Sequence, residues 1–364
     1  MIDHSFGLMA LRQMTYMGCV AAVMAGGLGA ATPSDATGRL VVHSGESIQR
    51  AVDAARPGDT IKIRPGEYRE NVVIDKSGLH LVGSGKVVIR PPGTRARDAC
   101  GAQSGSGICV VGRKDRPVRD VTLRGLTVEG FARNGIWASD TERLSVIDVA
   151  ARKNGVWGIA QQKSTRGVIK GNDVTENGDA GVFVANTVTE EGGAPDLGGT
   201  RIEHNRMWNN RIGLTVRRVR NLTVAHNSMT GNCGGLFIVG DESRPRAGEL
   251  TVRDNDISRN NKQCPATKRL PALQGSGIVL TGTEKARVVN NRIQGNAGKS
   301  PLSGGVVVFQ SFVKALSENN DVLDNTLTDN EPADLVNGDT KGKGNRFSRN
   351  YCRTSKPAGL CGKS

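Results

Sequence analysis

The sequence has few aromatic residues. Phe, Trp and Tyr together make up 4% of the 364 residues, whereas glycine occurs 48 times. A compact globular domain normally fills its centre with rings, so this scarcity argues against a single thick core. A solenoid has a thin aliphatic core and many turns, and it therefore needs glycine more than phenylalanine. The composition favours one elongated repeat domain over two ordinary globular domains.

Cys-x-x-Cys pairs are also absent, which disfavours a zinc site. Of the seven cysteines, Cys19 falls within a predicted export signal, so six remain in the predicted mature chain. An even number of cysteines indicates disulfides formed in an oxidising compartment. Many pairings are open to six cysteines, and spacing along the chain favours the following: Cys100–Cys109, Cys233–Cys264 and Cys352–Cys361.

Residues 1–31 have the features of an export signal. Arg12 precedes an apolar run over residues 14–31, which ends in small residues suited to cleavage shortly before Pro33. Glycines interrupt the run, which disfavours a retained transmembrane anchor. A lipoprotein alternative would use Cys19, but the residues before it match a lipidation box poorly. We expect a secreted, periplasmic or cell-surface protein, and a monomer.

Charge of one sign predominates. The formal net charge is +14, and it stays with the predicted mature chain because Asp3 and Arg12 cancel within the signal. An excess of positive charge on an exported protein favours anionic partners, such as an acidic polysaccharide or a cell-wall polymer. Nucleic acid is disfavoured, since the chain has no recognised nucleic-acid motif and few rings for base stacking. Part of the charge is also explained by solvated strand edges, where it prevents edge pairing.

An internal repeat organises the chain. The unit Asn-x-apolar-x-x-Asn recurs with its first asparagine at Asn172, Asn205, Asn227, Asn255, Asn291, Asn325 and Asn345. A Gly-aliphatic-x-aliphatic strand follows most copies, and another short strand precedes each first asparagine. Where nothing is inserted, the glycines of successive strands are 23, 23 and 22 residues apart, at 135, 158 and 181 and again at 213 and 235.

Three short alternating strands per repeat predict one triangular coil of a parallel β-helix. One coil cannot bury its inward face, so neighbouring coils stack in register about 4.8 Å apart. Asparagines at equivalent turns then form a ladder of side-chain amide hydrogen bonds. We expect this ladder at the turn opposite the binding face. A leucine-rich or helical repeat is disfavoured, because the leucine spacing is wrong and the repeat region has no helical period.

Residues 32–364 are expected to form a single β-helix domain, with coils over residues 67–350. In the N-terminal cap region, residues 39–66, an amphipathic helix is predicted from Ser47 to Arg56, with Ile48, Val52 and Ala55 on one face. It would cover the open end of the solenoid. Residues 351–364, which contain two of the cysteines, are predicted to form a C-terminal cap.

The segments Glu46–Val52, Pro57–Ile61 and Pro65–Val72 resemble the opening of pectin-lyase-like β-helix proteins. The asparagine repeats are similar to those of the carbohydrate-binding and sugar-hydrolase β-helix group. The resemblance covers nearly all of the predicted mature chain and implies an all-β, right-handed parallel β-helix. That superfamily contains pectate lyases, pectin esterases, polygalacturonases, alginate epimerases and non-catalytic relatives, so the fold alone selects no function.

The motifs that would select one of these enzymes are missing. The chain has no Asp-Pro-His-Asp of the alginate epimerases and no Gly-His-Gly or Asn-Thr-Asp of the polygalacturonases. The Gln-Asp and Asp-Phe-Ile-Phe-Gly motifs of the pectin esterases are absent as well. No catalytic residue can therefore be assigned by motif.

Insertions predict where a ligand would bind. They flank the glycine-led strand on both sides, at 187–199, 240–248 and 311–319 after it and at 261–274 and 297–303 before it. The outer face of this strand should therefore be a trough walled by loops. Alternation along the strand predicts two outward rows: Trp137, Ala160, Phe183, Thr215, Phe237, Val279 and Val307 form one, and Ser139, Gln162, Ala185, Arg217, Val239, Thr281 and Phe309 form the other. Charges at the strand ends are Asp140, Lys163, Arg218 and Asp241.

The outward rings of Trp137, Phe183 and Phe237 have two interpretations. They could form a platform on which sugars stack, with Arg217, Arg218 and Lys163 placed to meet carboxylates. Alternatively, the long loops fold over the rings and bury them as a satellite cluster. The second interpretation is favoured.

Catalysis on a uronate would require a base and a group that neutralises the developing charge. The candidate bases are Arg217 and Lys163, while Asp140 and Asp241 could hold Ca²⁺. These aspartates belong to coils too far apart to share one ion, and a hydrolase would need two facing carboxylates. A lyase or epimerase is thus the enzyme class to test, and no metal ligand set is assigned.

His204 and His226 occupy the same slot, directly before a ladder asparagine. We expect them to stack on the outside, in line with Asp254, Asn290 and Asp324, as solvated edge residues, although a histidine pair could also bind a metal. Two functions remain open. The chain acts on an acidic polysaccharide as a lyase or epimerase, or it is a non-catalytic β-helix that binds anionic glycans or scaffolds a partner.

Overall fold

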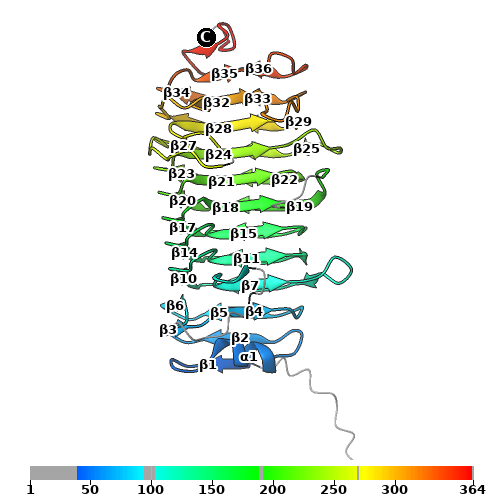
Figure 1. The fold of residues 1–364 in the computed structure, drawn as a ribbon, viewed down its shortest axis with the longest axis vertical. Coiled ribbons are helices and arrows are strands. Elements are labelled where there is room, and N and C mark those ends of the chain that lie inside the picture. The colour runs from blue at the N-terminus through cyan, green and yellow to red at the C-terminus, as the bar shows by residue number, and fades with distance from the viewer. Residues whose placement is uncertain (1–38, 94–99, 101–102, 188–191, 269, 363–364) are drawn as a thin grey trace, which may run out of the picture. The chain divides into compact units, whose positions relative to one another are not determined.

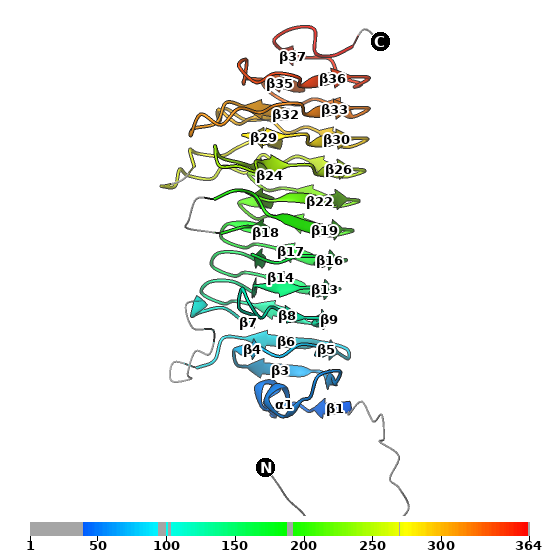
Figure 2. The same ribbon diagram turned by 90° about the vertical axis from the view of Figure 1, so that its right-hand side faces the viewer.

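Short parallel strands repeat in the order sheet A, sheet B, sheet C along the chain (Figures 1 and 2). The structure, a computed structural model, describes residues 39–93, 100, 103–187, 192–268 and 270–362. The predicted signal peptide lies outside these residues. Three long sheets form from the described strands, and every pairing between their strands is parallel. This confirms the all-β parallel β-helix.

Each sheet takes one strand from nearly every coil. Sheet A comprises β1 (Arg39–Val42), β2 (Thr60–Ile63), β5 (His80–Gly83), β9 (Thr122–Arg124), β13 (Ser145–Ile147), β16 (Val168–Lys170), β19 (Asp196–Glu203), β22 (Arg220–Ala225), β26 (Thr251–Arg253), β30 (Arg287–Val289), β33 (Asp321–Leu323) and β36 (Arg346–Ser348), with β25 (Ala247–Gly248) and β29 (Thr283–Glu284) beside its main path. Sheet B comprises β3 (Gly66–Arg69), β6 (Val87–Arg90), β10 (Thr127–Glu129), β14 (Ala150–Arg152), β17 (Asp173–Thr175), β20 (Arg206–Trp208), β23 (Ser228–Thr230), β27 (Asp256–Ser258), β31 (Arg292–Gln294) and β34 (Thr326–Thr328). Sheet C comprises β4 (Val72–Ile74), β7 (Ile108–Val111), β11 (Ile136–Ser139), β15 (Ile159–Gln162), β18 (Ala180–Ala185), β21 (Ile212–Arg217), β24 (Gly234–Val239), β28 (Ser276–Thr281), β32 (Gly304–Phe309), β35 (Leu335–Asn337) and β37 (Ser355–Lys356). A separate small pair joins β8 (Val118–Arg119) to β12 (Thr141–Glu142).

The core is a stack of aliphatic side chains inside the coils. On sheet C, Val182 lies between Ile159 and Leu214 in the adjacent coils, and all three are buried. Because successive side chains of a strand point to opposite faces, the residues between these inward positions face outward. The register therefore places the predicted outward rows on the outer face of sheet C.

The glycine that opens most sheet C strands is required by close approach. A Cβ atom on Gly181 would lie 2.8 Å from Nδ2 of Asn210 and 2.9 Å from the carbonyl oxygen of Gly213. Gly135 and Gly158 would meet Asn154 and Asn177 at the same distance of 2.8 Å. No room exists for a side chain at this column, which explains why the repeat places glycine there.

Two long asparagine ladders run along the described coils. The first lies at the corner between sheets A and B and joins Asn172, Asn205, Asn227, Asn255, Asn291, Asn325 and Asn350. The second lies between sheets B and C and joins Asn154, Asn177, Asn210, Asn232, Asn260, Asn296 and Asn330. The prediction of a ladder opposite sheet C holds for the first and is wrong for the second, which borders that sheet.

The expected last copy of the repeat, Asn345 to Asn350, is shifted by one corner. Asn345 accepts hydrogen bonds from Asn320 at the corner between sheets C and A, and Asn350 ends the first ladder. Phe347 pairs with Val322 in sheet A instead of filling the sheet B position. The corner that the motif occupies is thus decided by the coil on which it stacks.

The N-terminal helix forms as predicted but is shorter. Helix α1 spans Ile48–Ala54, and Ser47 is its N-cap. It stops because Ala55 is extended and Arg56 precedes a proline, which disfavours helical backbone. The carboxylate of Glu70 accepts hydrogen bonds from the backbone amides of Ile48 and Gln49 and so caps the helix from the adjacent coil. Strand β1 of sheet A precedes this helix in the chain, so sheet A begins within the predicted cap region.

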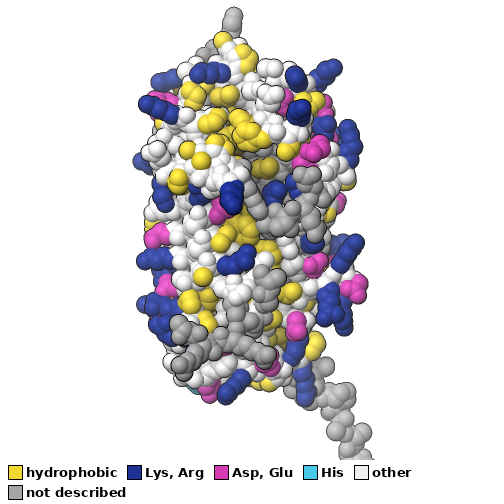
Figure 3. All heavy atoms as spheres, viewed as in Figure 1, with side chains coloured by type: hydrophobic (Ala, Val, Ile, Leu, Met, Phe, Trp, Pro, Cys, Tyr) yellow, Lys and Arg dark blue, Asp and Glu magenta, His cyan; other side chains and the backbone are white. Residues whose placement is uncertain are grey.

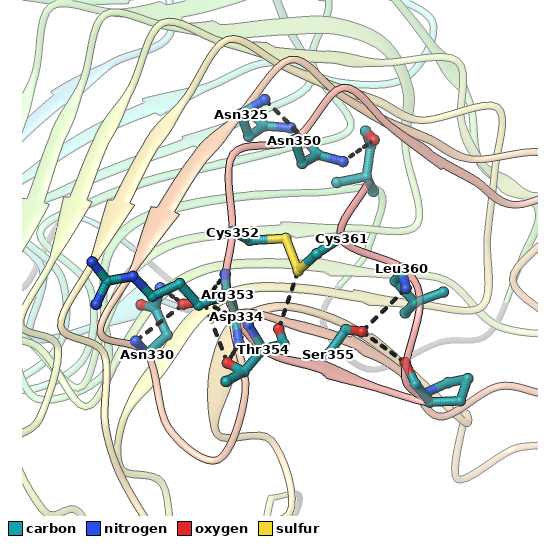
Figure 4. The surroundings of a disulfide bond; sticks show 12 residues. Asn325, Asn330, Asp334, Asn350, Cys352, Arg353, Thr354, Ser355, Leu360 and Cys361 are labelled. Carbon is teal, nitrogen blue, oxygen red and sulfur yellow. Dashed lines mark hydrogen bonds between the residues drawn. A yellow bond between two sulfur atoms is a disulfide. The ribbon is translucent and has the colours of Figure 1, made fainter. Parts of the chain in front are cut away.

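The C-terminal cap is tied by the Cys352–Cys361 disulfide (Figure 4). Asp334 is buried and replaces asparagine at the end of the second ladder. Its Oδ1 accepts from Asn330, and its Oδ2 accepts from the backbone amides of Arg353 and Thr354. Among the described residues the disulfides are Cys100–Cys109, Cys233–Cys264 and Cys352–Cys361, which confirms the pairing that spacing favours.

Candidate functional site

The outer face of sheet C carries a cluster of apolar side chains. Figure 3 shows apolar side chains along the centre of this face and Lys and Arg side chains along both sides. Loops from four of the predicted insertions, 240–248, 261–274, 297–303 and 311–319, contribute lining residues to one pocket on this face. This confirms that the inserted loops wall the outer face of sheet C.

The three outward rings are covered rather than open. The exposed fractions of Trp137, Phe183 and Phe237 are 3%, 6% and 2%. The sequence does not single out Trp157, whose ring lies between Trp137 and Phe183 with centroid distances of 6.0 Å and 4.2 Å. Because the stacked faces are occupied by one another, the interpretation of Trp137 and Phe183 as an open sugar platform is wrong, and the rings form a covered cluster.

One pocket lies over the first coils of sheet C, and we call it the N-terminal pocket. Its volume is about 650 Å³. Its lining includes Asp75, Gln103, Arg113, Arg116, Trp137, Ser139 and Gln162. The two arginines come from a tight hairpin in which their backbones bond to each other, and Cys100 of the Cys100–Cys109 disulfide also lines the pocket. The predicted residue Asp140 accepts a hydrogen bond of 2.6 Å from Ser139, which in turn accepts one from Gln162.

A second pocket, the C-terminal pocket, lies over β18 to β32. Its volume is about 430 Å³. Its rings are Trp157, Phe183, Phe237, Phe309 and Phe312, and its polar side chains include Asp179, Thr215, Arg217, Arg218, Asp241, Thr281 and Ser311. Hydrophobic side chains therefore dominate its walls, as in pockets that bind small molecules.

The predicted charges of the C-terminal pocket are largely internal partners. Arg218 and Asp241 form an ion pair between adjacent coils, and their side chains are only 8% and 6% exposed. Asp241 also accepts from the amide of Ser243. Asp241 thus neutralises Arg218 and does not meet Asp140, which lies four coils away, roughly 19 Å at about 4.8 Å per coil. This separation confirms the expectation that the two aspartates are too far apart to share one Ca²⁺ ion.

The two candidate bases do not converge. Arg217 is half-buried and lines the C-terminal pocket. Lys163 is exposed at the turn after β15, and it is not among the described lining residues of either pocket. It directly follows Gln162, which lines the N-terminal pocket. Lysine, histidine and tyrosine are absent from the described lining of both pockets.

Sequence reasoning missed Trp157, Asp179, Arg113, Arg116 and Phe312. Trp157 donates to the carboxylate of Asp179 at 3.3 Å, and the two residues lie just before β15 and β18 rather than on the strands themselves. Phe312 and both arginines lie on loops. A signal for the arginines was present, since two cations close together in a short insertion suggest an anion site, but their orientation depends on the hairpin.

The histidine pair lies on another edge. His204 and His226 stack with a centroid distance of 4.9 Å, both with left-handed backbone (φ of 57° and 55°). Asp254, Asn290 and Asp324 follow in the same left-handed row, as predicted. Among the described residues no group of three or more His, Cys, Asp and Glu side chains could hold a metal ion. In the same part of the chain, no helix is long and apolar enough to cross a membrane.

This architecture defines a right-handed β-helix. The family model for the right-handed β-helix region matches residues 95–249 and 202–361, which together are more than half of the chain. The chain therefore belongs to this family. No curated protein matches the sequence.

Several solved structures share the fold. The A-module of mannuronan C-5 epimerase AlgE6 from Azotobacter vinelandii is 19% identical, with a TM-score of 0.57 over 85% of this chain and 92% of that chain. DFA-IIIase from Arthrobacter chlorophenolicus A6, without its lid, is 13% identical, with a TM-score of 0.52 over 82% and 86%. The periplasmic alginate epimerase AlgG is 13% identical, with a TM-score of 0.51 over 86% and 83%. At these identities the likeness shows the fold alone.

Proposed function

We propose that this protein is secreted or periplasmic and binds an acidic polysaccharide along the outer face of sheet C. The observation that carries the proposal is the set of exposed cations around the N-terminal pocket. Arg113, Arg116 and Lys163 are all exposed, and none has a carboxylate partner among the described residues. Their charge is therefore available to an anionic ligand.

Several arginines on the other sheets are paired with carboxylates. At the edges of sheets A and B, Arg143 pairs with Asp120, and Arg346 pairs with Asp321, each across one coil. Such pairs neutralise charge locally and connect adjacent coils. Arg113, Arg116 and Lys163 differ from these paired arginines in having no carboxylate partner among the described residues, so their charge is not neutralised locally.

Further support comes from the similar structures and the disulfides. Two of the similar structures are epimerases of mannuronan and alginate by name, and for this chain they favour a sugar polymer as ligand. Disulfides at three places along the described chain are expected in a secreted or periplasmic protein. Both observations agree with the predicted export signal.

Affinity electrophoresis in gels that contain alginate or pectate, at increasing salt concentrations, tests this proposal. Replacing Arg113, Arg116 and Lys163 together by serine is expected to weaken binding on the order of tenfold and to flatten its salt dependence, because each exposed charge contact contributes little by itself. The matched control replaces three exposed cations elsewhere, Lys86, Arg201 and Lys343, and removes the same net charge. Equal losses in both triple variants would show unspecific attraction and refute the site.

A second candidate function is a polysaccharide lyase or epimerase. The observation in its favour is Arg217, which lines the C-terminal pocket beside the buried Arg218–Asp241 pair. Arg217 would act as the base and Arg218 would stabilise the developing charge. Incubation with uronate polymers would reveal unsaturated products by absorbance or a changed epimer ratio by NMR. Turnover that disappears in Arg217→Gln would favour this candidate, whereas no turnover across the panel would leave binding as the function.

A further inference from the structure

The mouth of the C-terminal pocket is apolar and exposed. Among the described residues, the exposed large hydrophobic side chains are Val41, Phe312, Val313 and Tyr351. Phe312, at 66%, and Val313, at 45%, are neighbours on the loop after β32, and both line this pocket. Exposed apolar groups gathered at a concave site indicate a ligand that covers them.

The walls of the pocket consist of rings from several coils. Trp157 and Phe183 stack nearly parallel at 4.2 Å, with an interplanar angle of 8°. Phe309 and Phe312 meet at 5.0 Å with a tilt of 59°. Edges of such rings favour a further aromatic ring in an offset or tilted arrangement.

Although Arg217 on the lining could meet a carboxylate, the ring-lined part of these walls does not suit a bare uronate polymer. Its hydroxyl and carboxylate groups would lose water without finding enough partners, at a cost of a few kcal/mol for each group left unpaired. A flat apolar group loses nothing comparable. The pocket is also large enough, since an apolar cavity of about 150 Å³ already holds one benzene ring, and this one measures about 430 Å³.

The same pocket can hold the atoms that join a ring to a sugar. Three residues that carry hydroxyl groups, Thr215, Thr281 and Ser311, are among its lining residues. A hydroxyl can donate to an ester carbonyl, which needs only one donor. The N-terminal pocket, on the same face of sheet C, would hold the charged part of the polymer.

We propose that the C-terminal pocket is a subsite for an aromatic ring carried by the ligand, such as an aryl ester on a sugar hydroxyl. The assignment of a sugar polymer as the carrier of this ring rests on the proposed function. The ring contacts the exposed face of Phe312 and the edges of the covered cluster, and the ester carbonyl accepts a hydrogen bond from a pocket hydroxyl. The ligand class is thus an aryl-substituted acidic polysaccharide.

Isothermal titration of the full mature chain with methyl cinnamate tests the subsite, with methyl 3-cyclohexylpropanoate as the saturated comparator. The aromatic ester should bind about threefold to tenfold more tightly than the saturated one, given the usual strength of ring pairs. Phe312→Ala should weaken its binding by a similar factor. Tyr351→Ala removes a ring of comparable exposure (59%) outside the pocket lining and should leave binding unchanged.

A second variant blocks the pocket without removing a ring. Thr281 is half-buried on the pocket floor, so Thr281→Arg should abolish binding of the aromatic ester. Equal or tighter binding of the saturated ester would overturn the aromatic assignment. No saturation up to the solubility limit, or equal weakening by Phe312→Ala and Tyr351→Ala, would overturn the subsite itself.

Alginate binding of the same variants separates the two proposals. Phe312→Ala should bind unsubstituted alginate as the parent chain does, because the charged contacts lie at the N-terminal pocket. If alginate binds and the aromatic ester does not, the subsite alone is refuted. If the ester binds and no acidic polymer does, the proposed function is refuted and the aryl pocket stands.

Discussion

Exchanging one ladder asparagine for aspartate should destabilise the solenoid strongly. Asn296 is an internal member of the second ladder, between Asn260 and Asn330, and is fully buried. Its Oδ1 accepts two hydrogen bonds from Asn260, and its Nδ2 donates to the carbonyl of Ile257 at 3.0 Å and to Oδ1 of Asn330 at 3.0 Å. In Asn296→Asp an oxygen replaces Nδ2 and faces both of these oxygens.

The cost follows from these contacts. Two buried hydrogen bonds are lost, each contributing about 1 kcal/mol, and both facing acceptors lose a partner. The aspartate is also charged and has no cationic partner, and an uncompensated buried charge costs about 3–5 kcal/mol. We expect a loss of about 3–5 kcal/mol in the free energy of unfolding, a large part of the total for a typical domain.

Acid should relieve this loss. Burial and the two facing oxygens raise the folded-state pKa of the introduced aspartate above its unfolded value of about 3.9. A raised carboxyl pKa destabilises the fold above that pKa, and the penalty disappears as pH falls below the unfolded value. A protonated carboxyl can also donate to Ile257. The difference in stability from the parent chain should therefore shrink between about pH 7 and about pH 4.

Urea unfolding followed by far-UV circular dichroism at several pH values measures both effects. The matched control is Asn319→Asp, an exposed position next to a ladder asparagine, which should change stability little. The reciprocal exchange Asp334→Asn should also destabilise, since its amide would face two backbone N–H donors. If Asn296→Asp unfolds with the midpoint of the parent chain, or if its deficit is independent of pH, the hydrogen-bond account of the ladder is wrong.

Other predictions concern the glycine column, the coil edges and the ligand sites. Gly181→Ala should lower the free energy of unfolding, measured in urea, by about 1–3 kcal/mol, because the added Cβ overpacks against Asn210. An unchanged midpoint would show that the adjacent coils shift to make room for the Cβ. The Arg346 guanidinium lowers the pKa of Asp321 by hydrogen bonding. The stability that this pair contributes is therefore fully present above the ordinary carboxyl pKa of 3.8, and it is lost as the pH falls through the lower pKa of the folded state. Arg346→Gln should therefore destabilise at about pH 7 and not at about pH 2.5, and an equal loss at both values would contradict the pairing. Serine at Arg113, Arg116 and Lys163 should weaken alginate binding about tenfold in affinity electrophoresis, whereas Phe312→Ala should weaken only the binding of the aromatic ester.

The repeat pattern carried most of the information about the fold. Alternating strands and stacked asparagines predict parallel coils because side-chain period and coil length are local properties of the chain. The disulfide pairing could also be predicted, because two of the disulfides join cysteines nine residues apart and the third joins cysteines 31 residues apart, before consecutive sheet C strands. Asn345 was misplaced because its motif is identical at two corners, and only the pairing of Phe347 with Val322 decides between them.

The candidate site was predicted in part. The outward rows of sheet C follow from alternation, and the loops that wall them follow from the lengths between repeats. Whether Trp137 is open or covered could not be read from the sequence, because it depends on the neighbouring Trp157 and on loop conformation. The pairing of Arg218 with Asp241 also arises only when consecutive coils stack.

The sequence by itself determined the coil, the register of its asparagines and the face that carries the insertions. These features depend on strand period and on spacing within one or two repeats. Tertiary structure alone decided which rings are covered, which charges are neutralised and which cations stay exposed around the N-terminal pocket. Those outcomes depend on contacts between loops and coils that are distant in sequence, and loop conformation follows from packing rather than from a local period.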